Sequence, residues 1–262
     1  SNEPPQEIPV SEIYSWLTQK EFLLHVPFLV VTCLNQGFFH QNLNPWLYRI
    51  GERIISSPND TVTNNTNNLH EDPIERDVSY YTNVFAYMQP IALIFSVAGS
   101  FILKFIQRMC KKSNNPENLS KINIERTALK YFILILTLTT CIVNLLMIIL
   151  EKVDSLDQNA TRYLIYLTFA LEIFSRTSFY SCLDIYCLLE FPVNAYGRCL
   201  GSFQLLWAIL APVNMGFLVI AQRNSFAVIW LFYLVVGLVA GMMSVLNYRK
   251  IVQSYQGEIF KM

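Results

Sequence analysis

Long apolar stretches constrain this chain more than any other feature of its sequence. Six mostly apolar windows lie at about 22–43, 81–103, 129–150, 163–190, 200–221 and 225–247. Each is long enough for a helix that crosses a bilayer, which needs about 20 residues. Hydrophobic residues make up 53% of the chain, which is typical of membrane proteins. We therefore predict an all-α membrane protein with six transmembrane helices in a lipid bilayer.

Lysine and arginine residues predict how these helices are oriented, because cytosolic loops of membrane proteins are enriched in them. One set of alternate loops and ends carries twelve, namely Lys20, Lys104, Arg108, Lys111, Lys112, Lys121, Arg126, Lys130, Arg198, Arg249, Lys250 and Lys261. The other set carries six, namely Arg49, Arg53, Arg76, Lys152, Arg162 and Arg223. We expect the first set, residues 1–20, the tail 251–262 and both termini to be cytosolic. The polar start without Met or signal peptide predicts that residues 1–20 belong to a cytosolic segment of a longer protein.

Glycosylation sequons give an independent signal for the same topology. Asn59, Asn64 and Asn159 each begin an Asn-X-Thr sequence, and the charge pattern places all three outside the cell. The first two lie in a polar external loop predicted over 44–80. We predict that all three asparagines are glycosylated, and passage through the secretory pathway favours the plasma membrane.

Composition and motifs argue against several classes of protein. The net charge is zero, and no basic face with interleaved aromatic residues is visible, so we expect no nucleic-acid partner. The six cysteines fall in apolar runs or on the cytosolic side, which predicts free thiols. Three irregularly spaced histidines predict no metal site. Since no constellation of nucleophile, base or cofactor ligands occurs, we expect neither an enzyme nor a cofactor.

Charged residues inside the fourth window mark the strongest candidate site. Glu172, Arg176 and Asp184 lie in an otherwise apolar run, and charges at this depth face protein or water rather than lipid. Glu172 and Arg176 are four residues apart, so they share a helix face and can neutralise each other. Two hypotheses remain open: Arg176 binds an anionic group of a solute while Glu172 tunes it or binds an amine, or the pair only stabilises helix packing or a gate.

Uncharged polar residues recur in the other windows. They are Asn35 and Gln36 in the first, Gln89 in the second, Asn144 in the third, and Gln204 and Asn214 in the fifth. Such residues either line a cavity or bond a neighbouring helix. Pro90 and Pro212 interrupt two of the helices, as happens near the binding sites of transporters and also in other membrane bundles.

The fourth and fifth windows resemble solute carrier family 43. The similarity is carried by the segment 176–181 (RTSFYS), by Phe191-Pro192, and by the segment 196–201 (YGRCLG). The segment 80–85 (YYTNVF), Gln89 and Gly99 are similar to the eighth helix of that family. Two departures concern the gating motif, where the chain reads Leu103-Lys104 without an acidic residue, and the first window, which lacks the family's arginine.

This resemblance implies a fold and a function. The chain is expected to be the C-terminal half of a major facilitator superfamily fold, a 3+3 inverted repeat that requires the N-terminal six-helix half as its partner. The implied function is facilitative transport of a small polar metabolite, foremost a neutral amino acid, by alternating access. Alternatives are transport of nucleobases or another solute, and a membrane scaffold without transport activity. The residues expected to line the central cavity are Asn35, Gln36, Gln89, Glu172, Arg176, Tyr180 and Gln204.

Overall fold

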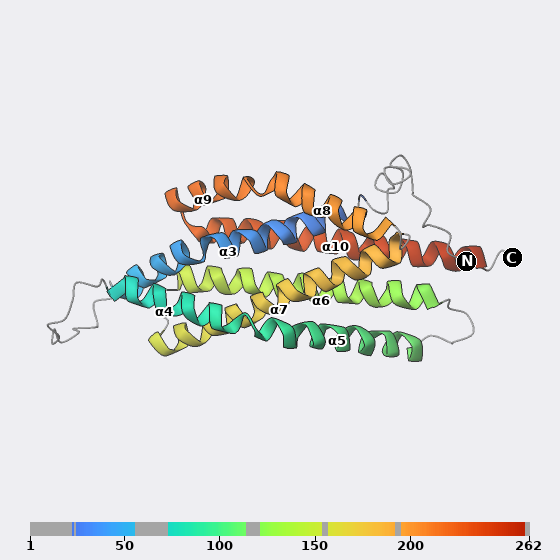
Figure 1. Ribbon diagram of the computed structural model, residues 1–262, viewed down its shortest axis with the longest axis horizontal. Helices are drawn as coiled ribbons and strands as arrows, with labels where there is room; N and C mark the ends of the chain where they lie inside the picture. Colours follow the sequence, from blue (N-terminus) through green and yellow to red (C-terminus); the bar gives the residue numbers. More distant parts are fainter. Residues whose placement is uncertain are drawn as a thin grey trace, which may run out of the picture.

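The computed structural model describes residues 23, 25–55, 73–113, 121–153, 157–191 and 195–259, and this part of the chain is helical without strands. Figure 1 shows the helices running side by side along the long axis of the molecule. They are α3 (Val26–Ile55), α4 (Pro73–Met88), α5 (Ile91–Ser113), α6 (Lys121–Lys152), α7 (Gln158–Glu190), α8 (Tyr196–Leu210), α9 (Val213–Arg223) and α10 (Phe226–Ile259).

Within the described ranges, four stretches of helix are long and apolar enough to cross a membrane. They are Ile91–Lys111, Ile124–Lys152, Tyr196–Arg223 and Phe226–Asn247. Large apolar side chains on all four are exposed, most of all on α5 and α8, with Leu93 at 75% and Ile209 at 65%. Apolar surface of this extent is stable in lipid but not in water, so the structure confirms the prediction of a helical membrane protein.

Two of the six predicted spans do not meet the same criterion. The windows 22–43 and 163–190 correspond to α3 and α7, which are long enough to span a bilayer but are interrupted by polar and charged residues that make them less apolar than the four stretches above. Those residues are largely buried against other helices, as described below. Both ends of the segment 44–80, predicted to be an external loop, are helical, because α3 continues to Ile55 and α4 begins at Pro73. Its external position stays a prediction.

Proline residues break three of the helices at definite points. In α3 the backbone leaves helical geometry at Asn42, three residues before Pro45. The helices α4 and α5 are separated by a turn at Gln89 and Pro90, while Ala211 and Pro212 separate α8 from α9. Proline lacks an N–H and its ring clashes with the preceding turn, so each of these breaks follows from the sequence.

Two hydrophobic clusters hold the helices together. One joins the start of α3, the first half of α6 and the second half of α7, and includes Leu136 and Phe179. The other joins the rest of α3, the second half of α6 and the first half of α7, and includes Val143 and Ile173. On α6 and α7, the residues between these positions belong to neither cluster. This middle stretch is therefore free to carry polar groups.

A layer of buried polar side chains fills this stretch between the two clusters. Its members on α6 and α7 are Thr137, Thr139, Thr140, Ser175 and Ser178. The hydroxyls of Thr140 and Ser175 hydrogen-bond across the two helices at 2.9 Å. The middle of the bundle therefore carries a layer of hydroxyl groups between the two hydrophobic clusters.

The closest helix packing occurs between α6 and α10. A Cβ atom added to Gly241 on α10 would lie 2.3 Å from the Thr137 hydroxyl on α6. Only glycine permits the two helices to approach this closely, as is common at helix contacts in membranes.

Polar contacts connect the helices near both ends of the bundle. At one end Glu151 of α6 accepts a hydrogen bond from Ser225 at 2.5 Å and lies 3.6 Å from Arg49 of α3. At the other end Arg126 of α6 donates two hydrogen bonds to Glu190 of α7, at 3.1 and 2.9 Å. The two hydrogen bonds between Arg126 and Glu190 form a bidentate pair, which fixes orientation as well as distance.

Candidate functional site

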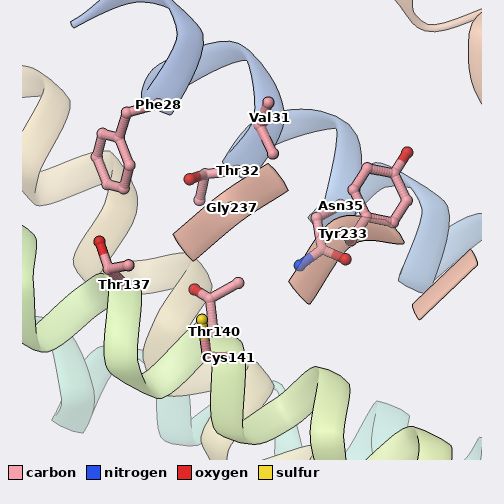
Figure 2. A pocket seen from close by; sticks show the side chains of 9 residues that line it. All are labelled: Phe28, Val31, Thr32, Asn35, Thr137, Thr140, Cys141, Tyr233 and Gly237. Carbon is pink, nitrogen blue, oxygen red and sulfur yellow. The ribbon is translucent and has the colours of Figure 1, made fainter. Parts of the chain in front are cut away.

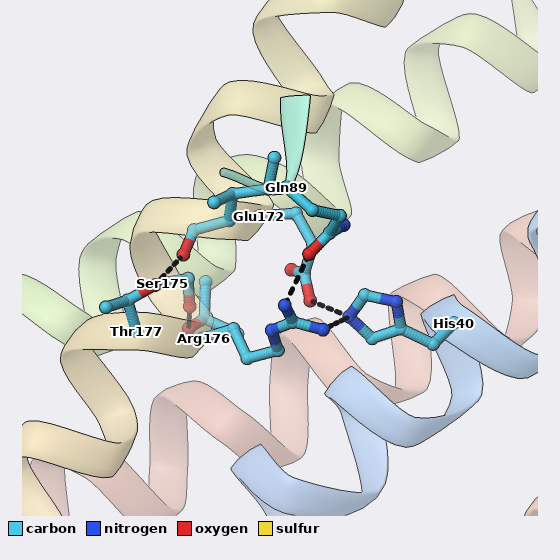
Figure 3. A network of polar contacts seen from close by, with 8 residues as sticks. His40, Gln89, Glu172, Ser175, Arg176 and Thr177 are labelled. Carbon is cyan, nitrogen blue, oxygen red and sulfur yellow. Dashed lines mark hydrogen bonds and ion pairs between the residues drawn. The ribbon is translucent and has the colours of Figure 1, made fainter. Parts of the chain in front are cut away.

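Four polar side chains from three elements meet beside the polar layer (Figure 3). Arg176 of α7 donates one hydrogen bond to Nε2 of His40 on α3 at 3.0 Å and another to Oε1 of Gln89 at 2.5 Å. Oε1 of Glu172 lies 3.9 Å from the same His40 nitrogen. The structure thus brings Gln89, Glu172 and Arg176, three of the residues predicted to line a cavity, into one network.

Helix breaks lie next to two members of this network. His40 precedes the kink of α3 at Asn42, whose amide nitrogen donates to the carbonyl oxygen of Phe38 at 2.9 Å. Gln89 occupies the turn between α4 and α5 beside Pro90. Irregular backbone at membrane depth is tolerated where it lines a cavity or is buried in protein.

The hydrogen bond from Arg176 defines the protonation state of His40. Arginine has five N–H donors and no acceptor, so His40 Nε2 must accept. That nitrogen therefore carries no proton, and the ring is neutral with its proton on Nδ1. A neutral ring offers no positive charge to Glu172, although the two groups lie 3.9 Å apart.

Glu172 is a buried carboxyl group of the site with an oxygen atom that lacks a hydrogen-bond partner. Its side chain is 2% exposed, and Oε1 has no hydrogen-bond partner. Burying an ionised carboxylate without a donor is very unfavourable. The site is therefore incomplete on the Glu172 side, where a proton or a cationic group is required.

The four-residue spacing allows Glu172 and Arg176 to neutralise each other, but the guanidinium makes its hydrogen bonds to other residues. Both side chains are described, and no ion pair joins them; the guanidinium turns to His40 and Gln89 instead. The physical reason is that two uncharged acceptors from neighbouring elements lie within hydrogen-bond reach of Arg176. One nitrogen of the imidazole ring then lies 3.0 Å from Arg176 and 3.9 Å from Glu172.

Asn35 and Gln36 make no hydrogen bond to the Arg176 network in the described part of the chain. Asn35 lines a cavity of about 10 Å³ between α3, α6 and α10, together with Thr140 and Tyr233 (Figure 2). That volume holds about one water molecule, and Oδ1 of Asn35 has no protein partner. Gln36 is also buried, with its Nε2 unpartnered.

The remaining predicted residues fall in different places. Tyr180 is 50% exposed one turn after Arg176 and packs edge-on against Phe179. Gln204 is exposed on α8, and no contact between it and the network is recorded in the described part of the chain. Asn159 is exposed in the first turn of α7, while Asn59 and Asn64 lie outside the described residues.

His40 is the member of the network that is absent from the residues predicted to line the site. It lies four residues after Gln36 and therefore on the same side of α3. A polar residue at this position in an apolar window was the available signal, but periodicity alone does not show that α3 packs beside Arg176.

The arrangement is suited to binding an anionic group. Arg176 is a permanent cation with fixed geometry for a carboxylate, and its present acceptors are both uncharged, so an anionic group can replace them. His40 is 27% exposed, which leaves the network accessible from one side. In the residues that the structure describes, no three His, Cys, Asp or Glu side chains are placed to hold a metal ion.

The fold and its exposed apolar faces define a helical integral membrane protein with a polar site between its helices. Comparison with protein-family models, curated proteins and solved structures gives no match.

Proposed function

We propose that this chain is the C-terminal half of a facilitative transporter that moves a small polar solute, foremost a neutral amino acid, by alternating access. Arg176 binds the carboxylate of the solute in this mechanism. The observation that carries the proposal is that Arg176 is held on two neutral acceptors, His40 and Gln89, beside a buried glutamate. Intramembrane charges of this kind are functional sites by default.

Broken helices support the proposal. If α4 and α5 count as one span and α8 and α9 as another, the six spans divide into two groups of three. The breaks at Pro90 and Pro212 then fall in the second span of each group. Interrupted helices in corresponding positions of two repeats are a mark of transporters with inverted repeats.

The exposed surfaces of α5, α8 and α9 support the proposal that a second, N-terminal half packs against this chain. The stretches containing α5 and α8 with α9 are the least buried of the four apolar spans, and α8 also carries the exposed Gln204. A polar side chain on such a face favours contact with protein or water rather than lipid. We infer that the N-terminal six-helix half packs on the face of α8 that carries Gln204 and completes the cavity.

Uptake of labelled leucine by cells that express the complete protein tests the proposal. We expect uptake above background for the wild type and a loss of about 100-fold or more for Arg176→Ala, because one charge-assisted anchor contributes several kcal/mol. Arg223→Ala is the matched control, since Arg223 is exposed at the end of α9, and it should transport normally.

Surface labelling must show equal amounts of the three proteins. Unchanged uptake by Arg176→Ala would remove Arg176 from the site. Uptake of adenine instead of leucine would favour the nucleobase alternative, and uptake of no solute would favour a scaffold.

A further inference from the structure

We propose that Glu172 is the binding group for the α-ammonium of the solute, and that the ammonium displaces a proton from Glu172 when it binds. The inference rests on the proposed function of the site and adds a specificity and a pH dependence to it. It follows from the arrangement of Glu172, His40 and Arg176 around a single ring nitrogen (Figure 3).

Without solute, His40 cannot stabilise an ionised Glu172. His40 Nε2 accepts from Arg176 and is unprotonated, so it cannot donate to Glu172. Oε1 of Glu172 is buried and without a hydrogen-bond partner. A carboxyl group in this position is stable when it holds a proton and very unfavourable when it is ionised.

The charges around Glu172 determine the net charge of the empty site. The charged or titratable groups recorded against it are His40 from α3 and Arg176 from its own helix. Gln89, from the turn between α4 and α5, contacts Arg176, and Thr140, from α6, contacts Ser175 of α7; both are uncharged. With a proton on Glu172 and a neutral His40, the empty site carries one positive charge, that of Arg176.

A bound amino acid pairs with both Arg176 and Glu172 in the loaded site. A neutral amino acid carries an ammonium and a carboxylate on one carbon atom, and the carboxylate takes the place of His40 and Gln89 on Arg176. The ammonium then lies beside Glu172, the carboxyl proton leaves to the aqueous side, and the new ion pair satisfies Oε1. One zwitterion enters and one proton leaves, so the loaded site is neutral.

Two consequences follow from this exchange. Proton and solute compete for Glu172, so acid weakens solute binding. A solute that has the carboxylate but no amine leaves Glu172 without its cation, and the site discriminates against it because a buried group would remain unpaired.

The experiment measures KM for leucine, at equal surface expression, at about pH 8 and about pH 6. Isocaproate, which is leucine without its amino group, is the second solute. Release of one proton predicts that KM for leucine rises as the pH falls, by up to about tenfold for each pH unit. Wild-type protein should take up isocaproate poorly at about pH 8.

Glu172→Gln should lose the pH dependence and should no longer prefer leucine over isocaproate, because glutamine neither titrates nor pairs with an ammonium. Glu172→Asp keeps the carboxylate and should keep both properties, in case the glutamine variant does not reach the surface. The matched control is Glu151→Gln, which removes another buried carboxylate outside the site, and its pH dependence should equal that of the wild type.

Equal KM for leucine at both pH values in the wild type overturns the inference while leaving the proposed function intact. The same holds if Glu172→Gln still rejects isocaproate. Absence of leucine uptake at either pH overturns the proposed function itself.

Discussion

Glu172 and Arg176 show how a pair that is plain in the sequence can act differently in the fold. Their spacing of four residues predicts a common helix face, and they do share one. The contacts of Arg176, however, come from α3 and from the turn between α4 and α5. Spacing along one helix determines which side chains can meet, whereas competition from neighbouring helices decides which ones do.

Ser225 offers a test of the buried polar contacts at this scale. Its hydroxyl donates to Glu151 at 2.5 Å and accepts from the backbone N–H of Ala227 at 3.2 Å, near the start of α10. Ser225→Ala removes both contacts and leaves the buried Glu151 Oε1 without this donor, which costs about 1–3 kcal/mol. We expect a lower midpoint of thermal unfolding in detergent. Ser202→Ala should change it little, because Ser202 bonds only to the Arg198 carbonyl of its own helix, and equal midpoints for the two variants would contradict the assignment.

At the scale of elements, the breaks were easier to predict than the packing. Pro90 and Pro212 are visible in the sequence, and both end a helix in the structure. By contrast, the helical turns at both ends of the predicted loop 44–80 were not foreseen, because polar residues are interspersed there where α3 continues and α4 begins. Polar helical turns outside the apolar windows carry no hydropathy signal. The role of His40 was equally invisible, since it depends on which helix packs beside α3.

The contact between α6 and α10 gives a prediction for an element pair. Gly241→Ala would place a Cβ atom 2.3 Å from the Thr137 hydroxyl, whereas Gly237→Ala, one turn earlier on α10, meets Val31 at an ordinary 3.9 Å. Overpacking costs about 1–3 kcal/mol, so only the first variant should lower the unfolding midpoint in detergent. Replacing Thr137 by Gly as well should restore part of the loss. Equal stability of the two alanine variants would show that α6 and α10 are not in close contact.

On the scale of the whole molecule, a polar layer lies between two apolar clusters, halfway along the bundle. The Arg176 network adjoins this layer. The sequence was sufficient to predict a helical membrane protein and to select Gln89, Glu172 and Arg176. Their meeting required the tertiary structure, because they lie on two segments far apart in the chain. The six-span count, the orientation and the second half remain predictions that the transport proposal uses.

The central claim is that this polar network is the solute site of a carrier that opens alternately to the two sides of the membrane. Counterflow tests it most directly: liposomes with the complete protein are loaded with unlabelled leucine, and entry of labelled leucine is followed. The account predicts faster transient accumulation in loaded than in empty liposomes for the wild type, and no such accumulation for Arg176→Ala. Entry that is equal in loaded and empty liposomes, or counterflow that persists in Arg176→Ala, would contradict it.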